Sequence, residues 1–419
     1  MNAPASINSS PIDSLASNSL PDDIEQHTRS TSARVSPSRR IWQRFKQHKI
    51  GYYSLFIFLV LYGLSLIGEV ISNDRPLVAY YHGQWYLPLL NDYPEATFGG
   101  ELPGSTDYLD PFIRTQLSNA DNFALYPLNP YYYDTLNYFS SAEHYPGPPS
   151  AENWLGTDAS GYDMTARLLY GFRVSVTFAL GLTLVGTILG IFIGAIQGYF
   201  AGKVDLFGQR IIEIWSSMPE LYLLIIFAAM FEPSFLFLFL LLALFGWINL
   251  ADYVRVEFLR NRQLEYVKSA RAMGLSSSQI IWRHILPNSL TPVITFLPFR
   301  MSAAIMALAS LDFLGLGVNA PAPSLGNLLS QGKNNLDAWW ISLATFSVLM
   351  LTLLLLTFIG EALRDALDTR LSDARLEEEE SEPVAVTNNN EKILSGEPVS
   401  PKKISIRHKN SDDLAVGAG

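Results

Sequence analysis

The chain has 419 residues, of which 49% are hydrophobic and only 16% are charged, and its formal net charge is −10. This composition is too apolar for an ordinary soluble chain of this length, and the apolar residues are strongly clustered. The absence of cysteine excludes disulfides, thiolate metal sites and a cysteine nucleophile. The six histidines are scattered without paired-ligand spacing, and there is no phosphate-binding loop, so neither a metal nor a nucleotide cofactor is expected.

The first 45 residues are rich in Ser, Asn, Pro and charge and lack helical or strand periodicity. They are predicted to form a disordered tail. The acidic residues gather in residues 74–163 and again after Glu361, so the negative charge belongs to two water-exposed regions. It does not indicate a nucleic-acid partner.

Six segments are long and apolar enough to cross a membrane, since a span needs about 20 mostly apolar residues. They are Ile50–Ile71, Val174–Tyr199, Ile214–Phe231, Phe235–Val254, Leu290–Leu311 and Trp339–Ile359. The alternative is a large soluble helical core, although soluble core helices rarely run this long without a polar face. The fold class that follows is all-α, a polytopic membrane protein that uses lipid as its solvent.

Lysine and arginine in short flanking loops predict the orientation. The first span is preceded by Arg39, Arg40, Arg44, Lys46 and Lys49. The loop between spans four and five carries Arg255, Arg260, Arg262, Lys268, Arg271 and Arg283, whereas residues 73–166 contain only two basic residues. Both termini are therefore predicted to be cytoplasmic.

Two extramembrane segments accompany the spans. Residues 73–152 are dense in Tyr, Pro, Asp and Asn, and they are predicted to form an outward-facing, packed insertion whose alternation is too poor to assign strands. Residues 371–419 are first acidic and then basic with few aromatic residues, and they are predicted to be disordered.

The loop over residues 257–289 has the pattern of two short helices. Leu264–Met273 has helical propensity, and Gly274 follows at the position of a left-handed helix C′ residue. Ser276-Ser-Ser-Gln279 is a capping box that opens a second helix, which Pro287 is expected to end. Small Ala270 and Gly274 would allow another protein to approach closely, but an amphipathic helix pair resting on lipid fits the same pattern.

This loop resembles the EAA loop of ABC-importer permeases, on Glu265-Tyr-Val-Lys-Ser-Ala-Arg-Ala-Met-Gly274 followed by Ile285-Leu286-Pro287-Asn288. In that family the loop docks into a cleft on the ATPase subunit. The resemblance implies that the ATPase-coupling residues are Lys268, Ala270, Gly274, Leu286 and Pro287. Lys268 stands where the family usually has an acid.

A second stretch, Gly156-Thr-Asp-Ala-Ser-Gly161-Tyr-Asp163 followed by Arg167, resembles a periplasmic motif of dipeptide and oligopeptide permeases. The implied motif residues are Gly156, Thr157, Asp158, Gly161, Asp163 and Arg167. Thr157 or Asp158 is expected to cap a short helix, and Arg167 is expected to snorkel to the membrane surface. Plain turn formation is the alternative for the glycines and aspartates.

The resemblance covers roughly residues 150–365 together with the first span, and it is closest to permeases of microcin C and peptide uptake systems. It implies a type I importer fold, with a transmembrane domain over residues 153–365 and a coupling loop at 257–289. The implied partners are a second permease, cytoplasmic ATPase subunits, a periplasmic peptide-binding protein, membrane lipid and a peptide substrate. The implied location is the inner membrane, and the chain itself would not be an enzyme.

Arg300 falls near the middle of the fifth span, where an arginine costs about 2.5–3.5 kcal/mol to insert. It is a candidate for the translocation path, where it would meet a peptide carboxylate; a structural ion pair or snorkelling is the alternative. Two other functions remain open. An ion-coupled secondary transporter would show inverted repeats, which the sequence lacks, and a membrane-embedded enzyme would need catalytic groups that converge within the spans.

Overall fold

The computed structural model describes residues 37–367 except 102–103, 120, 137, 139–143, 233 and 319–320. The predicted tail over 371–419 and most of the predicted tail over 1–45 lie outside the described residues. The prediction of disorder is wrong for residues 37–45, because they belong to helix α2 (Pro37–Gln47). Phe45 of this helix is buried against Ala362 and Ala366 of helix α15, a contact that the sequence near residue 40 does not reveal.

The described residues contain five helical stretches that are long and apolar enough to cross a membrane. They are α3 (Lys49–Leu66), α6 (Met164–Phe200), α9 (Phe235–Ala243) with α10 (Ile248–Asn261), α12 (Ser277–Ile280) running through a π-turn into α13 (Leu286–Phe313), and α15 (Trp339–Leu367). A short helix, α4 (Gly68–Ile71), follows α3. The mostly helical, polytopic class is confirmed.

The third predicted span, Ile214–Phe231, is not one straight helix. It is divided between α7 (Gly202–Ser216) and α8 (Glu220–Met230), which are bent by 65° relative to each other. Pro219 lies at this break with an extended backbone. Proline has no N–H to donate and disfavours helical geometry in the residue before it, so it ends α7 and starts α8 anew. The number of candidate spans is six if this bent pair counts as one.

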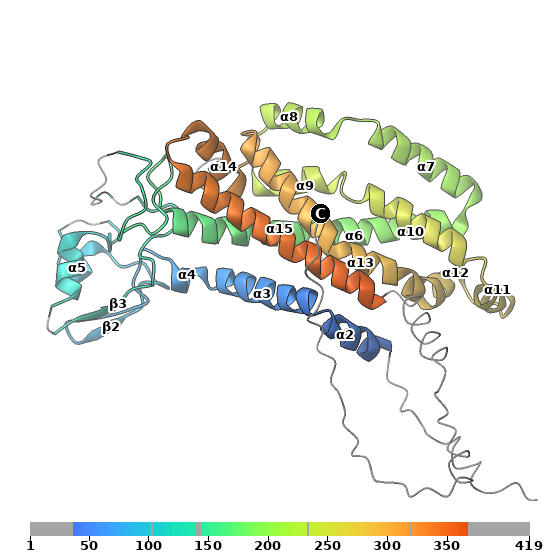
Figure 1. Ribbon diagram of the computed structural model, residues 1–419, viewed down its shortest axis with the longest axis horizontal. Helices are drawn as coiled ribbons and strands as arrows, with labels where there is room; N and C mark the ends of the chain where they lie inside the picture. The colour runs from blue at the N-terminus through green and yellow to red at the C-terminus, as the bar shows by residue number, and fades with distance from the viewer. Residues whose placement is uncertain are drawn as a thin grey trace, which may run out of the picture. The chain divides into compact units, whose positions relative to one another are not determined.

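Helix α6 packs closely against α10, and glycines on α6 make this possible. An added Cβ at Gly194 would lie 2.4 Å from the carbonyl oxygen of Ala251, and one at Gly198 would lie 2.5 Å from that of Arg255. Small residues at such spacing let membrane helices approach until their backbones touch. Helix α15 packs against α3 and α13, and α14 (Leu325–Asn334) packs between α13 and α15, as Figure 1 shows.

The insertion is a packed subdomain, as predicted, but it also contains strands that the sequence did not reveal. Strands β1 (Val78–Tyr81), β2 (Gln84–Tyr86) and β3 (Phe123–Leu125) form an antiparallel sheet in the order β2–β1–β3. One face of the sheet packs on a core around Phe98, together with the 3-10 helix η1 (Glu95–Phe98) and helix α5 (Pro111–Leu117).

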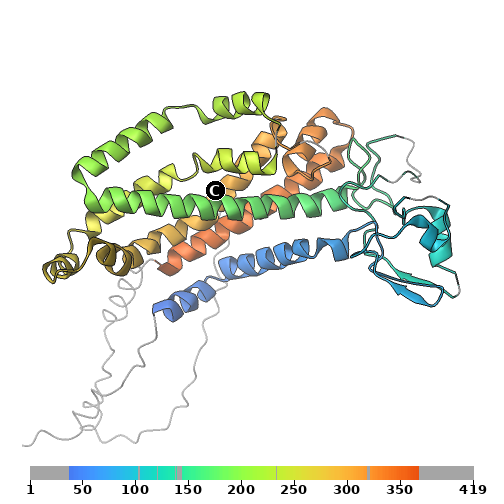
Figure 2. The same cartoon turned by 180° about the vertical axis from the view of Figure 1, so that it is seen from behind.

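The insertion and the segment around helix α11 (Glu265–Ala272) lie at opposite ends of the helical bundle (Figure 2). The end that carries the insertion is called the insertion end. The end that carries α11 and α12 is called the coupling end, and α2 also lies on this side, beside the final turns of α15. The candidate sites are therefore separated by the length of the spanning helices.

Candidate functional site

Helix α11 ends in a rigid corner at Gly274, which has a φ of +81° as predicted. The N–H of Leu275 donates to the carbonyl of Ala270, and the N–H of Gly274 donates to that of Arg271. This pair of bonds is a Schellman motif, which favours glycine at the left-handed position. No other atom lies within 4 Å of an added Cβ at Gly274, so this position faces open space.

The capping box that follows is also confirmed. The backbone N–H of Gln279 donates to the Ser276 hydroxyl, and the N–H of Ser276 donates to the Gln279 side chain. The expected end at Pro287 is wrong, because the chain continues through a π-turn over Ile281–Ile285 into α13. In a regular α-helix the proline ring would clash with the carbonyl one turn earlier. The wider π-turn lies at that carbonyl and makes room for the ring, so the helix continues.

Ala270 does not present a surface to another protein. It is fully buried, as is Val267, and both pack against Ile280 and Phe258 in the chain's own core at the coupling end. Leu286 is buried as well, whereas Lys268, Gly274 and Pro287 are exposed. The prediction that Ala270 provides a close-approach surface is therefore wrong, because its small side chain is part of the buried core that holds α11 to the rest of the coupling end.

The exposed surface of this corner carries apolar residues that the motif comparison did not single out. Met273 is 73% exposed and Trp282 is 60% exposed. The same segment carries the exposed cations Lys268, Arg271 and Arg283; Lys268 pairs with Glu265 at 2.8 Å. A large exposed aromatic residue and an exposed methionine are typical of an interface core. Hydropathy periodicity alone could not separate them from core residues.

At the insertion end, Asp163 caps α6. Its side chain accepts hydrogen bonds from Ala166 N, from Asn129 Nδ2 at 2.8 Å and from Asn153 Nδ2 at 2.9 Å. The expectation that Thr157 or Asp158 caps a short helix is wrong, because no helix begins there and Asp158 instead accepts from the N–H groups of Ser160 and Tyr162 in a turn. Burial raises the pKa of the Asp163 carboxyl above its ordinary value, although these hydrogen bonds act in the opposite direction.

Arg167 lies inside the protein and does not reach the membrane surface. Its side chain is 1% exposed, and its Nε lies 3.4 Å from Oδ2 of the fully buried Asp158. Its Nη1 donates to the carbonyl oxygens of Tyr133 and Pro321. The prediction of snorkelling is therefore wrong, because the chain supplies an anion and two carbonyls deep in the fold.

The remaining motif residues shape the backbone around this pair. Gly156 and Gly161 have φ values of +76° and +90°. A Cβ on Gly156 would lie 2.6 Å from the carbonyl of Gly147, and the Thr157 hydroxyl accepts a hydrogen bond from the N–H of Gly147. We refer to Gly156, Thr157, Asp158, Gly161, Asp163 and Arg167 as the polar lock. It connects the insertion, α6 and the loop before α14, and its members are buried.

Arg300 lies in the spanning part of α13 beside the break between α9 and α10. Its Nη2 donates to the carbonyl oxygen of Gly246 at 2.8 Å, and its buried Nε has no partner among the described residues. A cavity of about 270 Å³ here is lined by both Arg300 and Glu220, the first residue of α8. The sequence did not lead us to single out Glu220, although an acidic residue at the start of an apolar helix indicates a functional position.

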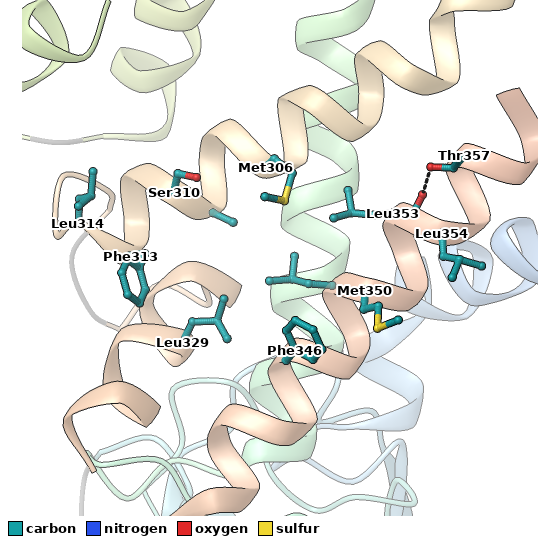
Figure 3. Close-up of a pocket in the computed structure, with 12 residues that line it drawn as sticks. Met306, Ser310, Phe313, Leu314, Leu329, Phe346, Met350, Leu353, Leu354 and Thr357 are labelled. Atoms are coloured by element: carbon teal, nitrogen blue, oxygen red, sulfur yellow. Dashed lines mark hydrogen bonds between the residues drawn. The ribbon is translucent and has the colours of Figure 1, made fainter. Parts of the chain in front are cut away.

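A larger cavity of about 780 Å³ lies elsewhere, between α13, α14 and α15 (Figure 3). Met306, Phe313, Phe346 and Met350 are among its lining residues, and the Thr357 hydroxyl already bonds the carbonyl of Leu353. Its walls offer no charged group that could orient a polar ligand, so the Arg300 cavity is the better candidate site. Within the described part of the chain, no group of three or more His, Cys, Asp or Glu could hold a metal ion.

Two family models match the chain. The model for the binding-protein-dependent transport system inner membrane component matches residues 168–373. The model for the N-terminal TM domain of oligopeptide transport permease C matches residues 36–88. Together they include the first span, most of α6, the coupling end and Arg300, whereas the polar lock at residues 156–167 lies between the two matches.

Curated relatives are similar over most of their length. The inner membrane ABC transporter permease protein YejE of Escherichia coli (strain K12) is 49% identical over 337 residues, which are 80% of this chain and 98% of that protein. The peptidoglycan transport system permease protein YejE of Agrobacterium fabrum is 46% identical over 80% of this chain and 93% of its own. The oligopeptide transport system permease protein OppC of Mycobacterium tuberculosis (strain ATCC 25618 / H37Rv) is 36% identical over 59% and 84%.

Among solved structures, an inward-facing MetNI methionine ABC transporter overlaps with a TM-score of 0.42 and 17% identity, over 49% of this chain and 98% of that chain.

Proposed function

The chain belongs to the family of binding-protein-dependent transport system inner membrane components, and from this premise we propose that it imports peptides or peptide-like compounds of the microcin C type. It is a multi-pass permease of the inner membrane, and ATP is hydrolysed by a separate subunit. The names of its relatives, which refer to oligopeptide and peptidoglycan transport, support a substrate built from amino acids. Family membership implies an ATPase and a binding protein as partners.

The exposed corner at Gly274 is the observation that best supports coupling to the ATPase. Schellman bonds and a capping box hold it rigid, and buried Val267 and Ala270 fix it to the end of the spanning helices. Met273 and Trp282 project from it into open surroundings. A rigid knob on continuous helix α12–α13 can transmit a push at the coupling end to the spanning part of α13, which suits alternating access by rigid-body movement.

The orientation that serves this function places the coupling end in the cytoplasm and the insertion in the periplasm. The basic residues before α3 and around α11 support it through the positive-inside rule. A reporter fused after Asp110 would then read periplasmic, and one fused after Arg271 would read cytoplasmic. A cytoplasmic reading at Asp110 would overturn the orientation and the coupling assignment with it.

Arg300 and Glu220 are proposed to lie on the substrate path of this permease half, with a second permease completing the path. A peptide carries a carboxylate at one end and an ammonium at the other, and the cavity offers one charge of each sign. The Arg300 guanidinium lines the cavity and donates to the Gly246 carbonyl through Nη2, so its charge is placed to meet a carboxylate. An intramembrane arginine is a functional candidate by default.

The function is tested by measuring uptake in cells whose chromosomal copy of the gene is deleted and which carry the gene on a plasmid. The chain should restore import of a labelled peptide, and affinity purification should recover the ATPase and the second permease. Failure of peptide import with an assembled complex would overturn the substrate class but leave the permease assignment intact.

A separate comparison tests the path. The Arg300→Gln variant should lose more uptake of a free-carboxylate peptide than of its C-terminal amide. Equal losses would show that Arg300 only holds the Gly246 carbonyl.

A further inference from the structure

Helix α2 carries basic residues that have been used so far only to infer the orientation of the chain. Its polar side presents Arg39, Arg40, Arg44 and Lys46, and no acidic residue occurs between position 37 and Glu69. None of these four cations forms a salt bridge with another described residue. Arg40 and Arg44 are four residues apart, so they lie on one face of the helix. This concentration of positive charge is therefore free to bind an anionic partner.

The apolar side of α2 is divided between the protein and its surroundings. Phe45 is 4% exposed and packs on Ala362 and Ala366 of α15. Trp42 is 47% exposed, and Lys46 Nζ lies 5.4 Å from the centre of its ring. Trp42 thus lies between the packed edge of the helix and its charged side. A helix with this division is typical of one that lies in the membrane interface.

The position of α2 next to the first span fixes where its charges lie. The helix ends at Gln47, and α3 begins at Lys49 with the His48 side chain as its cap. Helix α2 follows α3 at the coupling end with only a slight bend between them, as Figure 2 shows. Basic clusters beside a membrane helix on the cytoplasmic side attract anionic lipids, and an indole ring at headgroup level anchors such a helix.

We propose that α2 is a binding site for anionic phospholipid headgroups of the cytoplasmic leaflet, with Trp42 seated in the interface and the arginines facing the phosphates. This proposal rests on the orientation proposed above. Because Phe45 connects α2 to α15, and α15 packs on α13, bound lipid also braces the helix that continues into the coupling corner. The competing partner is the acidic run at residues 377–380, which lies outside the described residues.

Photo-cross-linking tests the site without relying on transport. Gln43 is exposed on α2, and p-benzoyl-phenylalanine at this position would sample what lies against the helix. The assembled complex is placed in nanodiscs with equal amounts of phosphatidylglycerol and phosphatidylcholine. Mass spectrometry then identifies the cross-linked lipid. We expect phosphatidylglycerol to be enriched on the order of tenfold, since each basic residue near an anionic surface adds to the attraction.

Charge variants give the control. The double substitution R40Q/R44Q should reduce the enrichment severalfold, whereas K203Q/R210Q on α7 removes the same charge elsewhere and should leave it unchanged. Equal cross-linking of both lipids in the unsubstituted helix overturns the proposal. Enrichment that appears only after truncation at residue 370 also overturns it, because the acidic run would then be the partner of α2.

Discussion

Arg167 Nε lies 3.4 Å from Asp158 Oδ2, and both side chains are withdrawn from solvent. Arg167 also donates to the carbonyl of Pro321, so this one side chain joins segments that lie far apart in the sequence. A buried ion pair with one member removed leaves an uncompensated charge. Removal of either charged side chain is therefore expected to destabilise the insertion end strongly.

The first prediction concerns Asp158→Asn. It should destabilise the chain by about 3–5 kcal/mol, because Arg167 would remain buried without its counter-ion. Asp92→Asn is the matched control, since the Asp92–Arg75 pair is exposed and worth at most about 1 kcal/mol. Thermal unfolding in detergent measures both. Similar unfolding temperatures for the two variants would contradict the role of the buried pair.

The second prediction uses the titration of Asp163, whose pKa in the folded chain is raised above the ordinary value of 3.8. Below 3.8 the carboxyl is protonated in both states, and above the raised pKa it is ionised in both. Between these limits the unfolded state loses its proton first, so stability falls as the pH rises through this window. The Asp163→Asn variant keeps an N-cap oxygen but lacks this titration.

Unfolding temperatures of the wild-type and Asp163→Asn chains, measured across acidic to neutral pH, test the sign. The advantage of the wild-type chain should be largest at low pH and should shrink as the pH rises. A difference that does not change with pH would show that the hydrogen bonds from Asn129 and Asn153 alone determine the effect of the substitution.

The third prediction concerns removal of the insertion. The N–H of Leu77 donates to the carbonyl of Leu125 at 2.8 Å, so a short Gly-Ser linker can replace residues 78–124. This excision keeps Asn129, which bonds Asp163, and so leaves the polar lock intact. We expect the complex to assemble. If the insertion supplies part of the surface on which the binding protein docks, and its loss costs about 1.4 kcal/mol of docking free energy, uptake should fall by about tenfold.

Two measurements separate these effects: recovery of the ATPase by affinity purification and import of a labelled peptide. Normal uptake by an assembled complex would show that the subdomain is dispensable. A failure of assembly would place the insertion in the contact between permease halves, and this would contradict a role limited to docking.

Local signals in the sequence predicted the corner at Gly274 because every atom that makes it lies within ten residues. A glycine after an amphipathic turn and a Ser-x-x-Gln box are sufficient to specify such a cap. The six hydrophobic segments were also readable, since their signal is additive along the chain. The break at Pro219 was not predicted, because the mean hydropathy of a segment says little about the effect of a single proline on the backbone.

Burial was the property that sequence reasoning misjudged. Ala270 was predicted to face a partner, and Arg167 to face the membrane surface, because small and basic residues often do so. Both are buried by contacts with residues far away in the sequence: Arg167 meets a loop 154 residues later. The partners of a side chain depend on how helices pack, and a single sequence without packing information does not contain this.

The last prediction concerns the coupling corner. A Cβ at the left-handed Gly274 costs about 1–2 kcal/mol, and a β-branched side chain tolerates this backbone least. Gly274→Val should therefore deform the corner, whereas Gly274→Asn should preserve it.

Both Gly274 variants should insert normally, because the corner lies outside the spans. Gly274→Val should weaken ATPase recovery and abolish uptake. Gly274→Asn separates two causes: it retains coupling if only backbone geometry matters, and it loses coupling if the ATPase packs directly on the glycine, since no atom of this chain occupies that space.

Lys268→Glu should be mild, because it disturbs an exposed pair worth about 0.3–0.5 kcal/mol. Pull-down of the ATPase and peptide uptake measure each variant. Wild-type levels of both in Gly274→Val would contradict the coupling assignment and leave the corner as a helix pair that rests on lipid.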